Sequence, residues 1–146
     1  MNTPFSAVSG RNYPTKVIPL IDAAKSNIDI VVFDWRFYPQ DPGSACQLFN
    51  QAILRAAKRG VKIRVIANND DVINILKKAG CQAKKLQTTR LVHCKILLID
   101  ENIAVIGSHN FTQSAFTANL ELSVILGEEI PKEEIIAFYN HIWALS

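Results

Sequence analysis

One continuous apolar stretch, residues 28–35 (IDIVVFDW), constrains the fold more than any other part of the sequence. A strand with one face in water alternates apolar and polar residues, whereas this stretch is apolar at nearly every position. It therefore predicts a strand buried on both faces. Strand and helix patterns alternate along the rest of the chain. Together they predict an α/β fold, in which a mixed β-sheet is flanked by helices on both faces.

The remaining patterns predict the other elements. Ser44 and Gln47 form a capping box before one helix, which Gly60 ends. Pro131 opens the last helix, and residues 100–102 predict a hairpin turn between two strands. The other helices are expected over residues 15–25, with Pro19 near the first turn, and over residues 70–79. Further strands are expected at residues 61–67, 91–100, 103–110 and 120–126.

Length and composition favour one globular domain spanning residues 1–146, since nearly half of the residues are hydrophobic. No apolar run approaches the roughly 20 residues of a membrane helix, so no stable membrane anchor is expected. The N-terminal residues lack the pattern of a secretory signal. The three cysteines, Cys46, Cys81 and Cys94, are widely spaced and fit reduced core thiols. We expect a cytoplasmic protein, or an exported one if a signal segment has been removed.

The charge is distributed unevenly. Between Arg55 and Lys95 there are eleven Lys or Arg residues and two Asp, whereas the rest of the chain carries five basic and eleven acidic residues. A set of solvated helix faces accounts for any single lysine. An asymmetry of this size favours a polyanionic partner such as nucleic acid.

Two polar pairs stand in otherwise apolar strands. His93 and Lys95 share one strand face by the period of two, and so do Ser108 and Asn110 on the next strand. If these strands are neighbours, an imidazole, an ammonium, a hydroxyl and an amide converge. These groups can hold a phosphate and supply a nucleophile. Gly107 would leave room for a ligand to approach the backbone.

The other two histidines are expected to lie outside this group of polar residues. His141, in the last helix, is expected to be structural, and His109 to alternate away from the site as a structural or surface residue. A metal site is not expected, because His93 has no Cys or His at ligand spacing on its face and Lys95 opposes a cation.

The spacing His93-x-Lys95-x4-Asp100-x6-Gly107-Ser108-x-Asn110 resembles the HKD motif of the phospholipase D superfamily. The resemblance implies a phosphodiesterase without metal or other cofactor, in which the motif histidine forms a phosphohistidine and a second motif histidine protonates the leaving oxygen. This chain has a single motif. A homodimer with its two-fold axis through the site is therefore expected, each chain supplying half of the site. The chain most resembles the stand-alone bacterial members of this size, which are nonspecific endonucleases acting as such dimers.

The resemblance also assigns roles to two acidic residues. Glu121 stands where the family has an acid that hydrogen-bonds the motif imidazole, although an ordinary strand-edge glutamate is an equal alternative. Asp100 falls at the hairpin turn on the opposite strand face from His93. It is expected to brace the hairpin rather than to touch phosphate.

Three functions remain open from the sequence. The first is a phosphodiesterase that acts as an endonuclease on DNA or RNA. The second is a phospholipid phosphodiesterase or phosphatidyltransferase, and the third is a nucleic-acid-binding protein without turnover.

Overall fold

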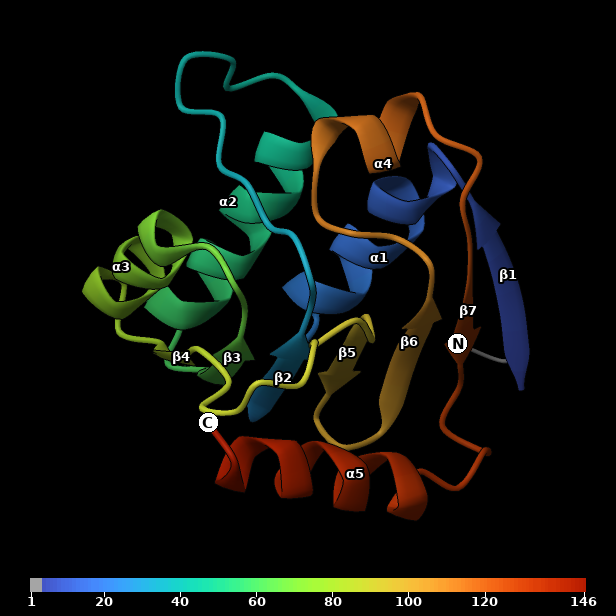
Figure 1. Ribbon diagram of the computed structural model, residues 1–146. Helices are drawn as coiled ribbons and strands as arrows, with labels where there is room; N and C mark the ends of the chain where they lie inside the picture. Colours follow the sequence, from blue (N-terminus) through green and yellow to red (C-terminus); the bar gives the residue numbers. More distant parts are fainter. Residues whose placement is uncertain (1–3) are drawn as a thin grey trace.

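The computed structural model describes residues 4–146 and consists of one mixed sheet between two helical layers (Figure 1). Helices α1 to α4 lie on one face of the sheet and α5 lies alone on the other. The helices are α1 (Asn12–Asp22), α2 (Ala45–Lys58), α3 (Asp70–Lys78), α4 (Gln113–Thr117) and α5 (Glu133–Ala144). The strands are β1 (Phe5–Ser9), β2 (Asn27–Val31), β3 (Lys62–Ile66), β4 (Gln82–Lys84), β5 (Ile96–Ile99), β6 (Ile103–Gly107) and β7 (Leu122–Leu126). The predicted fold class is confirmed.

The seven strands follow the order β1-β7-β6-β5-β2-β3-β4. β2, β3 and β4 are parallel, whereas the pairs from β2–β5 through to β7–β1 are antiparallel. Because β5 runs against β2, the start of β5 lies beside the end of β2, and Ile96 pairs with Val31. The end of β6 reaches the same place, since Ile106 pairs with Ile96. This end of the sheet carries the residues singled out by the sequence.

Several expected boundaries need correction. The first helix begins at Asn12 and ends at Asp22, so Pro19 lies in its second half rather than in its first turn. The buried strand ends at Val31, because the chain leaves the β3 ladder after Val32. The strand expected over residues 91–100 covers only Ile96 to Ile99. The strand expected over residues 103–110 ends at Gly107.

Local sequence signals explain the helix ends. Ser44 caps α2 by accepting a hydrogen bond from the Gln47 N–H. The Gln47 side chain accepts from Tyr38 N and Asn50 Nδ2 instead of reaching back to Ser44, so only half of the capping box forms. Gly60 has a φ of +96°, which ends the helix as predicted.

Each face of the sheet has its own core. The larger core lies beneath α1 to α4 and includes the fully buried Trp35, Phe49 and Phe111. The smaller core lies beneath α5 around the buried Tyr139. Asp29 and Arg64 are direct register partners on that face, and their side chains form a bidentate ion pair at 2.8 and 2.9 Å. Arg64 also stacks on the Tyr139 ring, which fixes α5 against the strands.

Candidate active site

His93 and Lys95 lie in the segment just before β5. The alternation predicted for them is correct, although they stand outside the ladder. Val92, Ile96 and Leu98 belong to the core beneath α5. His93 and Lys95 alternate with these residues, so their side chains face the other way. The burial of Val92 and the exposure of His93 follow the same alternation as the strand that begins at Ile96.

The Lys95 ammonium lies against the His93 ring. Its Nζ atom is 3.3 Å from Nδ1 and 3.4 Å from Nε2 of His93. Lys95 is only 9% exposed, whereas His93 is exposed. The two distances are nearly equal, so the ammonium lies over the face of the imidazole ring and not in line with one nitrogen lone pair. The in-plane lone pair of a neutral ring therefore stays accessible to a ligand.

Phe33, which follows β2, forms a wall of the site that sequence reasoning missed. Its ring centroid is 5.4 Å from that of His93, and Lys95 Nζ lies 6.0 Å from the same ring. The apolar character of residues 28–35 hid this residue, since it reads as one more buried strand position. Phe33 instead packs on the edge of the site and restricts how the imidazole can turn.

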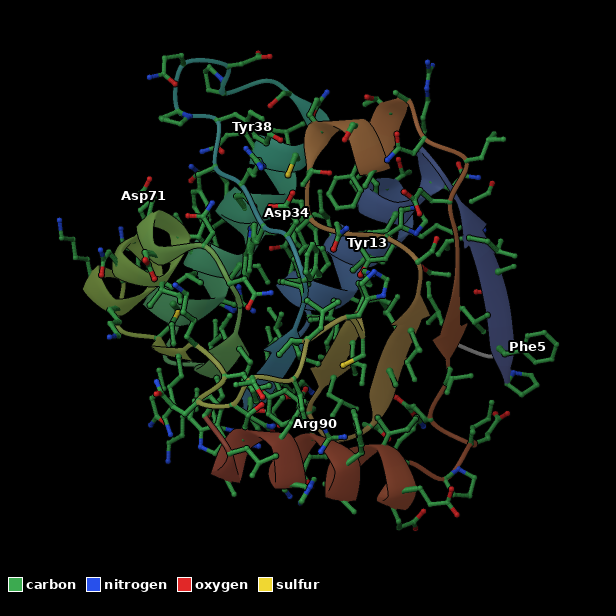
Figure 2. The ribbon with its side chains drawn as sticks, viewed as in Figure 1. Phe5, Tyr13, Asp34, Tyr38, Asp71 and Arg90 are labelled. Atoms are coloured by element: carbon green, nitrogen blue, oxygen red, sulfur yellow. The ribbon has the colours of Figure 1, made fainter. Side chains whose placement is uncertain are left out.

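Asn110 enters the site from the loop after β6. Its Oδ1 atom accepts a hydrogen bond from the backbone N–H of Asp34 at 3.0 Å, and this bond orients the amide. Figure 2 shows Asp34 beyond the end of β2. No residue within 4–146 accepts a hydrogen bond from Asn110 Nδ2, so both of its protons can be donated to a ligand.

Ser108 is engaged differently from the expectation. Its hydroxyl donates to Glu121 Oε1 at 2.5 Å and accepts from the Leu122 N–H at 3.0 Å. Its single proton is therefore used within the chain. The expectation that Ser108 donates directly to phosphate does not hold in this arrangement.

Glu121 also differs from the expectation. Its carboxylate accepts from Ser108 and, through Oε2, from Asn119 Nδ2 at 3.1 Å. Within residues 4–146 it makes no hydrogen bond to the His93 ring. The expected contact between Glu121 and the motif imidazole is therefore absent within one chain.

Gly107 is needed for the close pairing of β6 with β7. It pairs with Ser123 of β7, and a Cβ on Gly107 would lie 2.2 Å from Ser123 Oγ. Only glycine allows this approach of the two strands. Its expected role in leaving room for a ligand stays a prediction.

His109 is structural, as predicted, and it is fully buried. Its Nδ1 lies 2.7 Å from Ser123 Oγ, and its Nε2 lies 3.2 Å from the Gly10 carbonyl oxygen. A neutral imidazole satisfies both, donating from Nε2 to the carbonyl and accepting at Nδ1 from the hydroxyl. Burial lowers the pKa of His109, more than the Gly10 bond and Glu121 raise it. The ring thereby anchors the backbone between Ser108 and Asn110.

Asp100 stands at the other end of the sheet from His93. Its carboxylate accepts from the backbone N–H groups of Lys25, Ser26 and Asn27, at 3.0, 2.7 and 3.1 Å. Its partial burial raises the carboxyl pKa, but these three donors outweigh that effect and the net pKa is lowered. The residue braces the hairpin against the start of β2 and does not reach the site.

His141 is exposed on α5 and lines an apolar cleft together with His93. Within residues 4–146 it makes no side-chain hydrogen bond to the polar groups of the site. Within residues 4–146, no three His, Cys, Asp or Glu side chains gather as metal ligands would. Across the same residues, every helix is too short or too polar to cross a membrane.

The family model described as "Cardiolipin synthase, PLD-like domain" matches residues 17–143. The chain belongs to the phospholipase D-like family. Human mitochondrial cardiolipin hydrolase is 26% identical over 146 residues, a match that covers 96% of this chain and 54% of that protein. The phospholipase D-like chain thus spans about half the length of the curated relatives it matches.

Solved structures agree with the fold. The phospholipase D family member Nuc from Salmonella typhimurium superposes with a TM-score of 0.79 at 22% identity, covering 97% of this chain and 95% of that one. The archaeal chromatin protein TrmBL2, whose structure shows a novel mode of DNA binding, superposes with a TM-score of 0.65 at 17% identity. That match covers 98% of this chain and 53% of the chromatin protein. At these identities the likeness concerns the fold alone.

Proposed function

We propose that this phospholipase D-like protein is a phosphodiesterase that cleaves DNA or RNA through a phosphohistidine on His93, acting as a homodimer. The observation that carries the proposal is the group at the end of β2. An imidazole there has an ammonium at its ring nitrogens, and the Nδ2 protons of Asn110 remain free to donate. Lys95 and Asn110 would balance the charge that develops on the phosphoryl oxygens.

The reaction has two steps. A ring nitrogen of His93 forms a bond to phosphorus while the bond from phosphorus to the leaving oxygen breaks, and the partner subunit's His93 gives that oxygen a proton. A water oxygen then attacks phosphorus and its proton passes to the partner subunit's His93. The phosphorus–nitrogen bond breaks, which frees His93 and leaves a phosphomonoester and an alcohol.

Two features support nucleic acid as the substrate. The basic excess between Arg55 and Lys95 leads directly into the site. The fold is also shared with the archaeal chromatin protein TrmBL2, whose structure shows a novel mode of DNA binding.

A lipid phosphodiester is the second candidate, because an apolar cleft adjoins the site. The cleft has a volume of about 290 Å³ and lies between residues 86–94 and α5. His93 lines it, and Leu91 and Phe138 are 70% and 46% exposed at it. An acyl chain in this cleft would leave its headgroup phosphate near His93.

The deciding experiment is cleavage in EDTA. The purified protein is incubated with plasmid DNA, single-stranded DNA, RNA and a phosphatidylcholine analogue, each beside the His93→Ala variant. We expect wild-type protein to cleave nucleic acid with EDTA present, and the variant to lose several orders of magnitude in rate.

Activity that disappears in EDTA and returns only with Mg²⁺ would contradict the proposed chemistry. Cleavage of the lipid analogue alone would select the second candidate. Tight DNA binding without any cleavage would indicate a nucleic-acid-binding protein without turnover.

A further inference from the structure

A second hollow lies away from His93, between α3, β4 and the end of α5. Its volume is about 550 Å³. Three lysines line it: Lys77 from α3, Lys84 at the end of β4, and Lys85 in the loop that follows. The remaining lining residues are Asp70, Ile73, Asn74, Ala83, Gln87 and Ser146. We call this region the β4 hollow.

The lysine charges in the β4 hollow are available to a ligand. Lys85 pairs with Asp70 at 2.8 Å, but these side chains are 45% and 75% exposed, so the pair contributes little and can open. Lys84 is exposed, and its Nζ atom lies 4.2 Å from the centre of the Trp143 ring. This contact orients the ammonium without neutralising it. Lys77 makes no ion pair within residues 4–146.

The β4 hollow is joined to the candidate active site by the chain itself. Residues 85–92 lead from it to His93, and Gln87 N donates to the Leu145 carbonyl on the way. Arg90 adds a further charge on this stretch, and Figure 2 shows it on the side of α5. A long polyanion held at His93 would thus meet positive charge along the way to the β4 hollow.

The lining distinguishes a nucleic-acid strand from a lipid surface. Ile73 and Ala83 are the two apolar residues among the lining residues, and both are buried. A surface that docks on a bilayer exposes apolar side chains to enter it. Lysines with amide side chains between them suit a phosphate–sugar backbone.

We propose that the β4 hollow is a second binding site for the phosphates of a nucleic acid, which holds the strand at a distance from the phosphate being cleaved. The proposal rests on the proposed function only in that the substrate is a nucleic acid. It predicts that long substrates gain affinity from Lys77, Lys84 and Lys85, whereas a small diester does not.

Protection of a sheet edge is another use for lysines, because β4 is an edge strand. That use accounts for Lys84 alone. Lys77 lies on α3, and Lys85 follows the strand.

The test compares two triple variants with equal loss of charge. K77Q/K84Q/K85Q removes the lysines of the β4 hollow. K16Q/K25Q/K62Q removes three exposed lysines, on α1, in the loop before β2 and at the start of β3. Both are made with and without His93→Ala, and circular dichroism checks that each is folded.

Binding of a fluorescein-labelled 20-nucleotide single-stranded DNA is measured in the His93→Ala background across a salt series. We expect the hollow variant to lose at least about tenfold in affinity at low salt, and its log–log salt slope to fall by about 2, since each lost phosphate contact removes about 0.7. The control variant should stay close to the parent. Equal losses in both variants would overturn the proposal, because the effect would then be general electrostatics.

Catalysis separates this proposal from the proposed function. The hollow variant should hydrolyse bis(p-nitrophenyl) phosphate at the wild-type kcat/KM but cleave the 20-nucleotide DNA with a raised KM. Cleavage of DNA at wild-type KM by this variant would overturn the second site alone. Binding that depends on the hollow, with no cleavage by wild-type protein, would overturn the proposed function alone. Loss of binding to phosphatidylglycerol vesicles, with DNA binding unchanged, would assign the lysines to a membrane and overturn the proposal.

Discussion

The Oγ atom of Ser108 donates a hydrogen bond to Oε1 of Glu121 across 2.5 Å, so the two residues act as one unit. A hydrogen bond to a charged group contributes about 1.5–3 kcal/mol, and each 1.4 kcal/mol is about tenfold in rate. Because this unit fixes the loop that carries Asn110, we expect Glu121→Ala to lower kcat by about 10-fold to 100-fold, with little change in KM. Steady-state kinetics on bis(p-nitrophenyl) phosphate measures the effect.

A double-mutant cycle checks that Ser108 and Glu121 act together. The variant Ser108→Ala/Glu121→Ala should be no slower than the worse single variant, because both substitutions remove the same bond. Asn119→Ala, which removes only the 3.1 Å bond to Oε2, should cost less. Fully additive losses would show that Glu121 acts independently of Ser108, for example on an imidazole of the partner chain.

Asp100 should matter for stability and not for chemistry. Asp100→Ala removes the acceptor of three backbone N–H groups at the start of β2, so we expect it to lower the free energy of unfolding by about 2–4 kcal/mol. The kcat for a small diester should stay at the wild-type value in the folded protein. Urea unfolding and steady-state kinetics on the same preparation test both parts.

Glu101→Ala is the matched control, because Glu101 adopts the same left-handed backbone. The φ angles are 55° at Asp100 and 54° at Glu101, so alanine meets similar strain at both positions. The difference between the two variants then isolates the carboxylate bonds of Asp100. A rate loss in Asp100→Ala at unchanged stability would place this residue in the reaction instead.

Much of the sheet centre could be predicted from the sequence. The apolar run at residues 28–35 and the turn at residues 100–102 place β2, β5 and β6, and the period of two places His93 with Lys95. These features are local, so a single sequence carries them. The capping residues Ser44 and Gly60 are local in the same sense.

The missed elements depend on distant or short segments. β1 pairs with β7, where Phe5 meets Leu126, so its pairing is non-local and its own pattern is weak. β4 has three residues and α4 has five, lengths at which periodicity is uninformative. Thr112, which caps α4, is the signal that was available for that helix.

The site itself shows the same division. The residues of the motif could be predicted from their spacing, but the hydrogen-bond partner of each polar side chain could not. The spacing of the motif is compatible with a Ser108 hydroxyl that donates to a ligand or to a neighbouring side chain, and in the folded chain it donates to Glu121. Phe33 and the approach of Gly107 to Ser123 depend on packing between strands, which no spacing in the sequence specifies.

His109 should make the folded protein sensitive to mild acid. Burial depresses its pKa below the ordinary value of 6.5, so the unfolded chain binds more protons than the folded one once the pH falls below that value. The free energy of unfolding should therefore decrease as the pH is lowered from 7.5 to 5.5. Urea unfolding at several pH values in this range measures the decrease.

His109→Gln tests the source of this pH dependence. Glutamine keeps a donor and an acceptor for Gly10 and Ser123 but does not titrate, so stability should become flatter between pH 7.5 and 5.5. The variant should also lose about 1–3 kcal/mol at pH 7.5, because two buried bonds are disturbed. His141→Gln, on exposed α5, is the control and should keep the wild-type slope. An unchanged slope in His109→Gln would assign the effect to another group.

The proposed dimer gives the most stringent prediction. One chain supplies one His93, and the proposed reaction needs a nucleophile and a proton donor together. Two imidazoles across a two-fold axis can divide these roles, because protonating one disfavours protonating its neighbour. Leu120, beside Glu121, is fully exposed and Leu122 is 57% exposed, so an apolar surface is available next to the site. The mass in solution should be twice the chain mass of 16.3 kDa.

Subunit mixing decides whether the two histidines cooperate. If wild-type and His93→Ala chains exchange freely at equal amounts, about half of the dimers are mixed. A mixed dimer can attack phosphorus but lacks the second imidazole, so it should be inactive or hold a covalent phosphohistidine. Activity per wild-type chain should then fall to about half, and labelled phosphate should remain on the protein after acid-free denaturation. Activity per wild-type chain that stays constant at every mixing ratio would mean that each chain works alone, and the two-histidine reaction would not apply to this protein.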